Sequence, residues 1–580
     1  MLTAVLEDRH SRESIGEEIR LFGVRLEQLY RGEITEDQLR PFRLKHGVYG
    51  QRQPGFQMVR VKVPSGILNP EQLRVLADIA DTYSTGRGHL TTRENVQYHF
   101  VKMENVTTVM GLLADAGLTT REACGNTVRN ITSCPLAGVC PTESFDVTPY
   151  ALATTQFFLR HPDFHDLPRK FKIAFSGCED DGNCAVAGIH DVGLIARFRG
   201  SNGTAHRGFK VLVGGGLGSL PTEAATFTEF LPEENLIPTI EAILRVFKDH
   251  GNRKNKLKAR MKFVLRAKGI EEFRRLVEEK LATVETPAGT RTIPSPVAAP
   301  LVSISPVTSS KNGASAEYQV WAQHNLQPQR QAGHALIWIK LPAGNIQAHQ
   351  FRGLADLLEK YKLPAARIAI SQDLVIPWAP LARAGEIFHD LQALSLATPG
   401  ARTIADVTGC PGATTCNLGI TRSLTLADEL AREFADETDP EIKKLRIKIS
   451  GCPNSCGQHH IADIGLYGNA RKVGEQQAPY YQLMLGGEVS ADGVRFARQV
   501  VPVPAKRIPQ ALHALLELYR RERSADQSFR AWAVNTPDAA IVAHLQKYID
   551  TTNEREEDLF VDWGDQEIYS LKLGRGECAA

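Results

Sequence analysis

Four cysteines in the C-terminal half have the type and spacing of metal ligands. They form two pairs, Cys410-x5-Cys416 and Cys452-x3-Cys456, in the segments TGCPGATTC and SGCPNSC. A four-iron cluster needs soft thiolates that converge on one point, and glycine-bearing turns let the backbone approach closely. Zinc is the main competitor, but paired ligands of structural zinc sites are usually separated by about two to four residues. The longer loop between Cys410 and Cys416 therefore favours an iron–sulfur cluster.

Basic side chains gather in three segments of the N-terminal half, TGRGHLTTRENVQYH, CGNTVRN and LPRKFK. Taken alone, each cation is more typical of a solvated surface than of a site. Arginine suits bidentate contact with an oxyanion, and lysine supplies a point charge and a proton. Together with the cysteine motif, the three segments indicate an anion-binding site. Their cations are Arg87, Arg93, Arg129, Arg169, Lys170 and Lys172.

The chain contains a long internal repeat. VRVKVPSG at 59–66 returns as IWIKLPAG at 337–344, and NITSCP at 130–135 returns as DVTGCP at 406–411. FKIAFSGC at 171–178 returns as LRIKISGC at 445–452, and a Gly-Gly at 214–215 returns at 486–487. The first three matches are offset by 278, 276 and 274 residues. We infer two homologous halves, each with a small domain followed by a larger one.

Within each half the apolar pattern indicates mixed α and β structure. A strand directly precedes each Ser-Gly-Cys turn. Between the halves, the Pro-, Ser-, Thr- and Ala-rich segment 283–316 suits an extended linker, or equally a disordered insertion. We expect strands over 57–63, 96–102, 171–176, 335–341, 367–376 and 445–450, and helices over 70–83, 234–249, 347–361 and 507–523.

Length and composition limit the classes of function. A chain of 580 residues is too long to fold around one hydrophobic core. Its 68 Lys and Arg residues nearly balance its 66 Asp and Glu residues. This balance argues against nucleic-acid or membrane-surface binding driven by bulk charge. We see neither an N-terminal signal core nor a membrane-spanning apolar run, and we expect a cytoplasmic protein. In that reducing compartment the ten cysteines are more typical of metal ligands or buried thiols than of disulfides.

The cysteine motifs resemble those of a known family. TGCPGATTC followed by KISGCPNSCGQHH is similar to the cluster motif of sulfite and nitrite reductases, and the resemblance covers nearly the whole chain from about residue 45. It implies an α+β fold of two pseudo-symmetric halves, each with a small ferredoxin-like α/β domain and a larger sirohaem-binding α+β domain. It also implies two cofactors, sirohaem and a [4Fe–4S] cluster. The cluster ligands would be Cys410, Cys416, Cys452 and Cys456, with Cys456 also bridging to the sirohaem iron.

The resemblance sets domain boundaries along the chain. An N-terminal extension covers 1–46, and a linker covers 283–330. The expected small domains are 47–122 and 331–400, and the expected large domains are 123–282 and 401–580.

The same resemblance assigns roles to the basic residues. Arg93, Arg129, Lys170 and Lys172 would face the sixth coordination position of the iron. Sirohaem itself would contact Arg87, Arg169, Gln97, Asn454 and Cys456.

Lys172 bears on the substrate, because nitrite-type members of the family tend to have Asn at its position. A second ammonium favours the more highly charged sulfite ion. We therefore expect a six-electron reduction of sulfite to sulfide, with reduction of nitrite to ammonium as the alternative. Two other possibilities are a precorrin ring-modifying oxygenase of the same ancestry and a non-catalytic protein stabilised by zinc or a cluster.

The source of electrons follows from what the sequence lacks. VLVGGGLGS at 211–219 suggests a dinucleotide loop, but no helix pattern opens directly after it. We interpret it as a close backbone approach to the sirohaem. No other segment indicates an NAD(P)H or flavin domain, so we expect the donor to be a ferredoxin or a separate flavoprotein.

Four more cysteines lie at the repeat-equivalent places in the first half. They could hold a second cluster, but we interpret them as remnants of the duplication or as buried thiols. They are Cys134, Cys140, Cys178 and Cys184.

Overall fold

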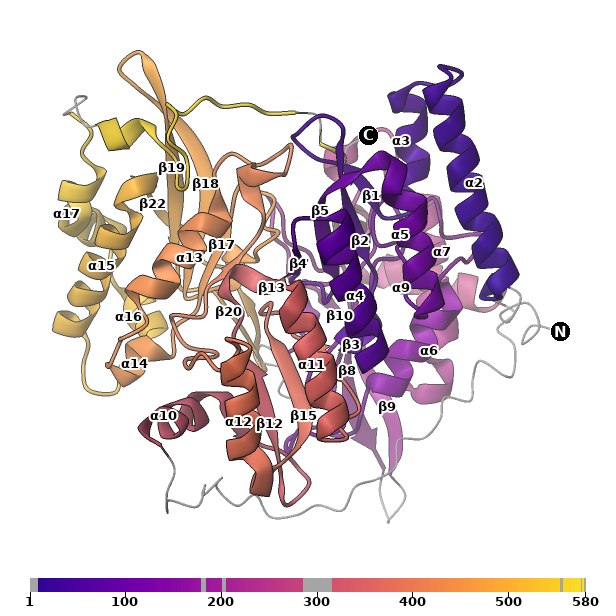
Figure 1. The fold of residues 1–580 in the computed structure, drawn as a ribbon, viewed down its shortest axis with the longest axis horizontal. Helices are drawn as coiled ribbons and strands as arrows, with labels where there is room; N and C mark the ends of the chain where they lie inside the picture. Colours follow the sequence, from indigo (N-terminus) through magenta and orange to yellow (C-terminus); the bar gives the residue numbers. More distant parts are fainter. Residues whose placement is uncertain are drawn as a thin grey trace.

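The computed structural model describes residues 9–178, 184–200, 205–284, 315–552, 557–574 and 576–577. Its first half and second half are each built from a small sheet and a larger sheet (Figure 1). The predicted α+β fold with two repeated halves is confirmed.

The first small sheet is antiparallel, in the order β1-β2-β5-β4-β13. Helix α4 (Pro70–Tyr83) covers it and begins with a capping box between Asn69 and Gln72, with Pro70 in the first turn. The helix turns its apolar side chains onto the sheet. The strands are β1 (Val48–Gly50), β2 (Phe56–Val61), β4 (Arg87–Leu90), β5 (Val96–Lys102) and β13 (Asn345–Gln347), and helix α5 (Val106–Asp115) comes soon after β5.

The second small sheet repeats this plan in the order β11-β12-β15-β14-β3. Its strands are β11 (Leu326–Pro328), β12 (His334–Ile339), β14 (Ala366–Ile368), β15 (Leu374–Pro380) and β3 (Ile67–Leu68). Its helices are α11 (Ala348–Lys360) and α12 (Ala384–Ala393).

The halves exchange edge strands. β13 belongs to the second half but pairs with β4, and β3 belongs to the first half but pairs with β14. Helices α4 and α11 lie side by side (Figure 1), and reciprocal ion pairs join them. Arg74 is 2.9 Å from Asp356, and Arg352 is 2.9 Å from Asp78. One continuous hydrophobic core therefore lies beneath both small sheets.

Each larger domain holds a mixed five-stranded sheet, β10-β9-β8-β7-β6 in the first half and β16-β17-β18-β19-β22 in the second. The first three strands along the chain run parallel and the rest antiparallel. All four residues of β7 and of β17 are buried, as expected for a central strand. The strands are β6 (Thr132–Ser133), β7 (Ile173–Ser176), β8 (Val192–Arg199), β9 (His206–Val213), β10 (Ala225–Pro232), β16 (Thr408–Gly409), β17 (Ile447–Ser450), β18 (Ile464–Val473), β19 (Gln476–Leu485) and β22 (Arg498–Pro504).

Helices cover these larger sheets. The first half carries α6 (Thr148–Phe158), α7 (Leu236–His250), α8 (Met261–Lys268) and α9 (Ile270–Leu281). The second half carries α13 (Ser423–Glu433), α14 (Pro440–Lys443), α15 (Ile508–Glu522), α16 (Phe529–Asn535) and α17 (Asp538–Ile549), together with the hairpin of β20 (Glu488–Ser490) and β21 (Gly493–Arg495).

Both ends of the described chain meet at the first small domain. Helices α2 (Arg12–Tyr30) and α3 (Glu36–Lys45) insert Phe22 and Leu39 into the shared core. The C-terminal tail returns to the same place, where Glu577 pairs with Arg43 at 2.6 Å. The expected extension 1–46 is therefore well packed from α2 onward.

Two expectations differ from the structure. The linker predicted over 283–330 falls largely outside the described residues, but its described part from 315 on holds regular elements: α10 (Ala316–Asn325) buries Trp321, and β11 pairs with β12. The single strand predicted over 367–376 is two strands. A turn at Gln372 (φ 77°), closed by the Ala369–Asp373 hydrogen bond, separates β14 from β15. Among the described helices, none is long and apolar enough to cross a membrane.

Candidate functional site

The four second-half cysteines lie on two turns at the same end of neighbouring parallel strands. Cys410 follows β16 and Cys452 follows β17, and the Cys410 amide donates to the Ile449 carbonyl at 3.3 Å. Parallel strands bring their carboxyl ends to one edge of a sheet. The fold therefore unites two pairs that are far apart in the sequence.

Glycines make this convergence possible. A side chain at Gly451 would meet the backbone of Gly412 at 2.5 Å, and one at Gly457 would meet the Ile449 carbonyl at 2.0 Å. Gly412 adds a left-handed backbone conformation (φ +56°) that disfavours any other residue. The two turns thus pack backbone to backbone.

The environment of the thiols suits a multinuclear cluster. Burial and the nearby Cys456 raise the pKa of Cys410 to about 12, so its thiolate needs positive iron to form. The Gly451 amide donates to the Cys410 sulfur at 3.2 Å, an interaction that tunes iron–sulfur clusters. One tetrahedral zinc would hold its sulfurs about 3.8 Å apart, but no three Cys, His, Asp or Glu in the described part of the chain form a single-ion site. The residues fit a four-iron cluster better than zinc.

A tight turn between β4 and β5 brings Arg93 to these cysteines. The Thr91 hydroxyl accepts from the Arg93 and Asn95 amides, both at 3.2 Å. The Thr92 hydroxyl donates to the Cys456 carbonyl at 2.9 Å, and Cys456 is exposed. This hydrogen bond joins the first half's basic turn to the second half's last cysteine.

Arg93 extends from this turn toward strand β7. Its guanidinium donates to the Ile173 carbonyl at 2.9 Å, while its Nε is buried with no hydrogen-bond partner among the described residues. Burial lowers the pKa of Arg93 to about 9. An anion at this point would satisfy both the unpaired donor and the charge.

Lys172 lies within electrostatic range of both Arg93 and Lys170. Burial, and then Arg93 and Lys170, lower the pKa of Lys172 well below its usual value. The structure adds a cation that sequence reasoning missed: Arg260 pairs with the fully buried Asp191 at 2.9 Å, and Asp191 also accepts from the Lys172 amide. The basic run KNKLKARMK, which contains Arg260, was the only sequence signal for it.

Arg129 is buried near Arg93 but has partners of its own. Its guanidinium donates to the carbonyls of Gly125 at 2.7 Å and Ala123 at 3.3 Å. These contacts hold the CGNTVRN loop. Contact of Arg129 with substrate stays a prediction.

A narrow cavity beside the cysteine turns is lined by two of the five residues expected to contact sirohaem, Arg87 and Gln97. Arg87, Gln97 and His99 line it from the first small sheet, and Pro411 and Thr415 from the second half. Both ring nitrogens of His99, and the Thr415 hydroxyl, are buried without a partner in the described part of the chain. Such polar atoms suit a macrocycle with carboxylate side chains.

Arg60, on β2, is a second residue that sequence reasoning missed. Its Nε lies 2.9 Å from the amide oxygen of Gln97 in the orientation that satisfies both side chains. The sequence feature that could have drawn attention to Arg60 is the internal repeat, because Arg60 lies in the repeated segment VRVKVPSG. Two further residues expected to contact sirohaem lie in different places. Asn454 donates to the Cys452 sulfur at 3.5 Å, and Arg169 is half-buried in the loop before β7.

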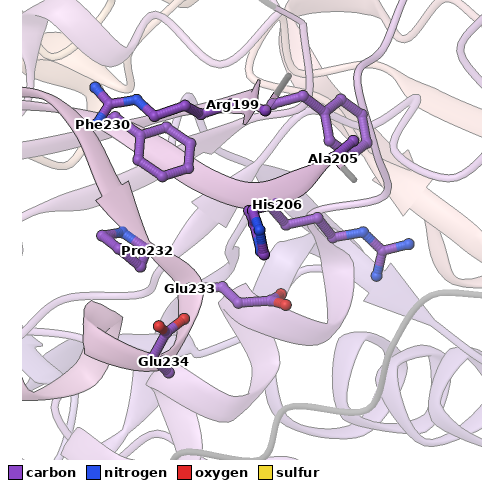
Figure 2. Close-up of a pocket in the computed structure, with 10 residues that line it drawn as sticks. Arg199, Ala205, His206, Phe230, Pro232, Glu233 and Glu234 are labelled. Carbon is purple, nitrogen blue, oxygen red and sulfur yellow. The ribbon is translucent and has the colours of Figure 1, made fainter. Parts of the chain in front are cut away.

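Another hollow, of about 600 Å³, lies away from these residues at the β8–β9–β10 edge (Figure 2). Arg199 stacks over Phe230 there, with 4.4 Å from guanidinium carbon to ring centroid. No residue of the predicted site lines it. The glycines at 214–216 pack closely on neighbouring backbone, since a side chain at Gly215 would meet the Gly188 carbonyl at 2.6 Å. Their approach to sirohaem stays a prediction.

Comparison with known families decides the identity of this arrangement. The profile described as "Nitrite and sulphite reductase 4Fe-4S domain" matches residues 124–284 and 400–535. The profile "Nitrite/Sulfite reductase ferredoxin-like half domain" matches 49–116 and 327–394. The chain belongs to the nitrite and sulfite reductase family. Sirohaem and a [4Fe–4S] cluster are the cofactors of this family.

The similar proteins include enzymes named for nitrite and enzymes named for sulfite. An assimilatory ferredoxin-dependent nitrite reductase of Haloferax mediterranei is 30% identical, over 88% of this chain and 87% of its own. A sulfite reductase [ferredoxin] of Mycolicibacterium paratuberculosis is also 30% identical, over 85% and 87%. The solved structure of the Mycobacterium tuberculosis NirA protein superposes with a TM-score of 0.74 at 27% identity, over 88% of this chain and 92% of that one. The oxidoreductase class is therefore settled, and the family resemblance is confirmed.

Proposed function

We propose that this protein reduces sulfite to sulfide in a six-electron reaction, and that Cys410, Cys416, Cys452 and Cys456 hold the cluster. One observation carries the substrate: Lys172 lies within electrostatic range of both Arg93 and Lys170, and the turn that holds Arg93 is tied to Cys456 through Thr92. Sulfite is more highly charged than nitrite at neutral pH. A site that concentrates cations therefore favours sulfite.

The chain's own residues bind the anion and supply protons. Arg93 offers donors with fixed geometry, and Lys172 offers a mobile ammonium. Because the pKa of Lys172 is low, its ammonium gives up a proton readily once a sulfite oxygen accepts it. When bound, sirohaem supplies an open iron position for the substrate and the cluster supplies single electrons.

The alternative substrate is nitrite, which would be reduced to ammonium. The Haloferax relative is named for nitrite at the same identity as the mycobacterial relative named for sulfite. Both relatives are named for ferredoxin, which supports ferredoxin as the electron donor. We propose that the donor is a ferredoxin or a separate flavoprotein, and that the enzyme works in the cytoplasm.

A steady-state comparison tests the substrate. The purified holoenzyme is given sulfite or nitrite with a reduced viologen as donor, and kcat/KM is measured for each. We expect kcat/KM for sulfite to be at least about tenfold higher, which corresponds to about 1.4 kcal/mol of transition-state binding. A clear preference for nitrite would overturn the sulfite assignment.

A further inference from the structure

Four cysteines of the first half occupy the same places as the proposed cluster ligands. Cys134 and Cys140 follow β6 as Cys410 and Cys416 follow β16, at an offset of 276 residues in both cases. Cys178 follows β7 as Cys452 follows β17, at an offset of 274.

Cys184 completes the set, because the repeat offset changes to 272 before it. The left-handed residues Val186 (φ 49°) and Gln458 (φ 64°) are 272 apart, and each opens a short 3-10 helix. At this offset Cys184 is equivalent to Cys456. All four ligand positions are therefore cysteine in both halves, although neighbouring positions such as Leu136 and Gly412 differ.

The hydrogen bonds that frame the two sets are also equivalent. The Cys134 amide donates to the Phe175 carbonyl at 3.0 Å, as the Cys410 amide does to Ile449. The Ser144 amide donates to the Gly177 carbonyl at 2.7 Å, as the Ile420 amide does to Gly451 at the same distance. The backbone that presents the cysteines has thus been kept in both halves.

Each cysteine turn is also held by the opposite half in the same way. The Arg330 amide donates to the Val139 carbonyl at 2.8 Å, as the Arg52 amide does to Thr415. The Gln331 side chain donates to the Gly138 carbonyl at 3.0 Å, as Gln53 does to Thr414 at 2.9 Å. These contacts need a loop of matching shape, and a collapsed remnant would lose them.

The four sulfurs converge. Those of Cys140 and Cys178 are 3.7 Å apart, well beyond a disulfide bond. Cys134 and Cys184 share a hydrogen bond, and the charge of each of the other three acts on Cys134. Three of the sulfurs are buried in an apolar cluster with Trp338.

Two arginines lie within electrostatic range of these thiols. Arg367 donates to the Pro135 carbonyl at 3.0 Å and to that of Ala137 at 2.6 Å, within electrostatic range of Cys134. Arg402 lies within range of Cys184 and over the Trp338 ring. The two arginines offset part of the net charge of −2 that four thiolates give a [4Fe–4S]2+ core, although the buried Glu143 also acts on Cys140.

We propose that Cys134, Cys140, Cys178 and Cys184 bind a second [4Fe–4S] cluster, which gives the enzyme another one-electron centre. The inference uses the proposed catalytic cluster as its template and goes beyond the proposed function. Each thiol releases its proton as its sulfur binds iron, and the core enters without a change in oxidation state. A single zinc ion would hold sulfurs about 3.8 Å apart, close to the Cys140–Cys178 distance of 3.7 Å. The cluster is favoured instead by the five residues within each cysteine pair, more than structural zinc sites use, and by the equivalence to the second-half set. This replaces the interpretation of the four cysteines as remnants.

Metal and sulfide analysis of the wild-type holoenzyme, purified without oxygen, tests the proposal. We expect about eight acid-labile sulfides and about nine irons per sirohaem, since each cubane holds four of each. Mössbauer spectra should show two cubanes. Four sulfides per sirohaem, or one zinc per chain, would overturn the second cluster, and no sulfide would overturn the catalytic cluster as well.

Paired variants assign the sulfide to each site. The double variant C134S/C178S should keep the sirohaem absorption band and lose about half of the sulfide. The reciprocal variant C410S/C452S should also keep about half, now in the first-half site. As a control, Cys124→Ser alters a buried thiol outside both sets and should keep all of it. Full sulfide content in a folded C134S/C178S variant would contradict the proposal.

Discussion

In the proposed function, substrate choice depends on Lys172. This residue is half-buried, within electrostatic range of Arg93, Lys170 and Arg260, and Asp191 opposes part of their charge. Gathering like charges away from water is costly unless an anion completes the site. Sulfite would provide that charge, and nitrite provides less of it.

Replacing Lys172 with Asn should separate the two substrates. We expect kcat/KM for sulfite to fall about ten- to one-hundredfold, because one charge-assisted contact is lost. For nitrite we expect a change of less than about threefold. Steady-state kinetics with a reduced viologen measure both, and Lys254→Asn, at an exposed lysine, is the control. Equal losses on both substrates would refute this role.

The pH dependence of the same variant distinguishes charge from shape. The pKa of Lys172 is lowered, so the group loses its proton at a lower pH than an ordinary lysine. Sulfite binds best to the protonated form. KM for sulfite in the wild type should therefore rise with increasing pH, beginning at a lower pH than an ordinary lysine would give, and it should rise less steeply in Lys172→Asn.

At the scale of elements, the cysteine turns depend on glycines that no other residue can replace. Gly457 follows Cys456 directly and packs against the carbonyl of β17's Ile449. Its amide also donates to the Ser450 hydroxyl at 3.0 Å. Any side chain here must push the Cys456 turn away from the other three ligands.

The variant Gly457→Ala should therefore lose the cluster. The added carbon would lie 2.0 Å from the Ile449 carbonyl, so the turn must shift. We expect sulfite turnover to fall more than about one-hundredfold, because a ligand displaced by about 1 Å no longer binds well. Gly111→Ala, in α5 with open space around it, should behave as wild type. If Gly457→Ala kept full iron content and activity, close packing would not position the cysteines.

The elements that carry the site were largely predictable, and the edges between them were not. Alternating and helical patterns placed β2, α4, β5, β7 and β17 to within a few residues. β3 and β13 have only two or three residues, too few for a period to appear. Arg260 was missed because its partner Asp191 is distant in the sequence. Such pairs follow from the three-dimensional fold, which periodicity alone does not give.

At the scale of the whole molecule, the duplicated halves form one folding unit. Each small sheet ends on a strand from the other half, and α4 packs against α11 over a shared core. The proposed site has the same plan, since Arg93 and Lys172 come from the first half and the cluster cysteines from the second. The duplication has therefore produced two halves that complete each other.

Expressing residues 1–284 and 315–580 as separate chains tests this interdependence. Alone, each half would expose an unpaired sheet edge and the apolar face of α4 or α11, a known cause of aggregation. We expect neither half to give a folded monomer by size-exclusion chromatography and circular dichroism. Co-expression should restore a soluble complex that reduces sulfite, because the reciprocal strands and the Arg74 and Arg352 ion pairs can re-form. A stable monomer from either half alone would show that the exchanged strands are dispensable, and the halves would then be independent domains.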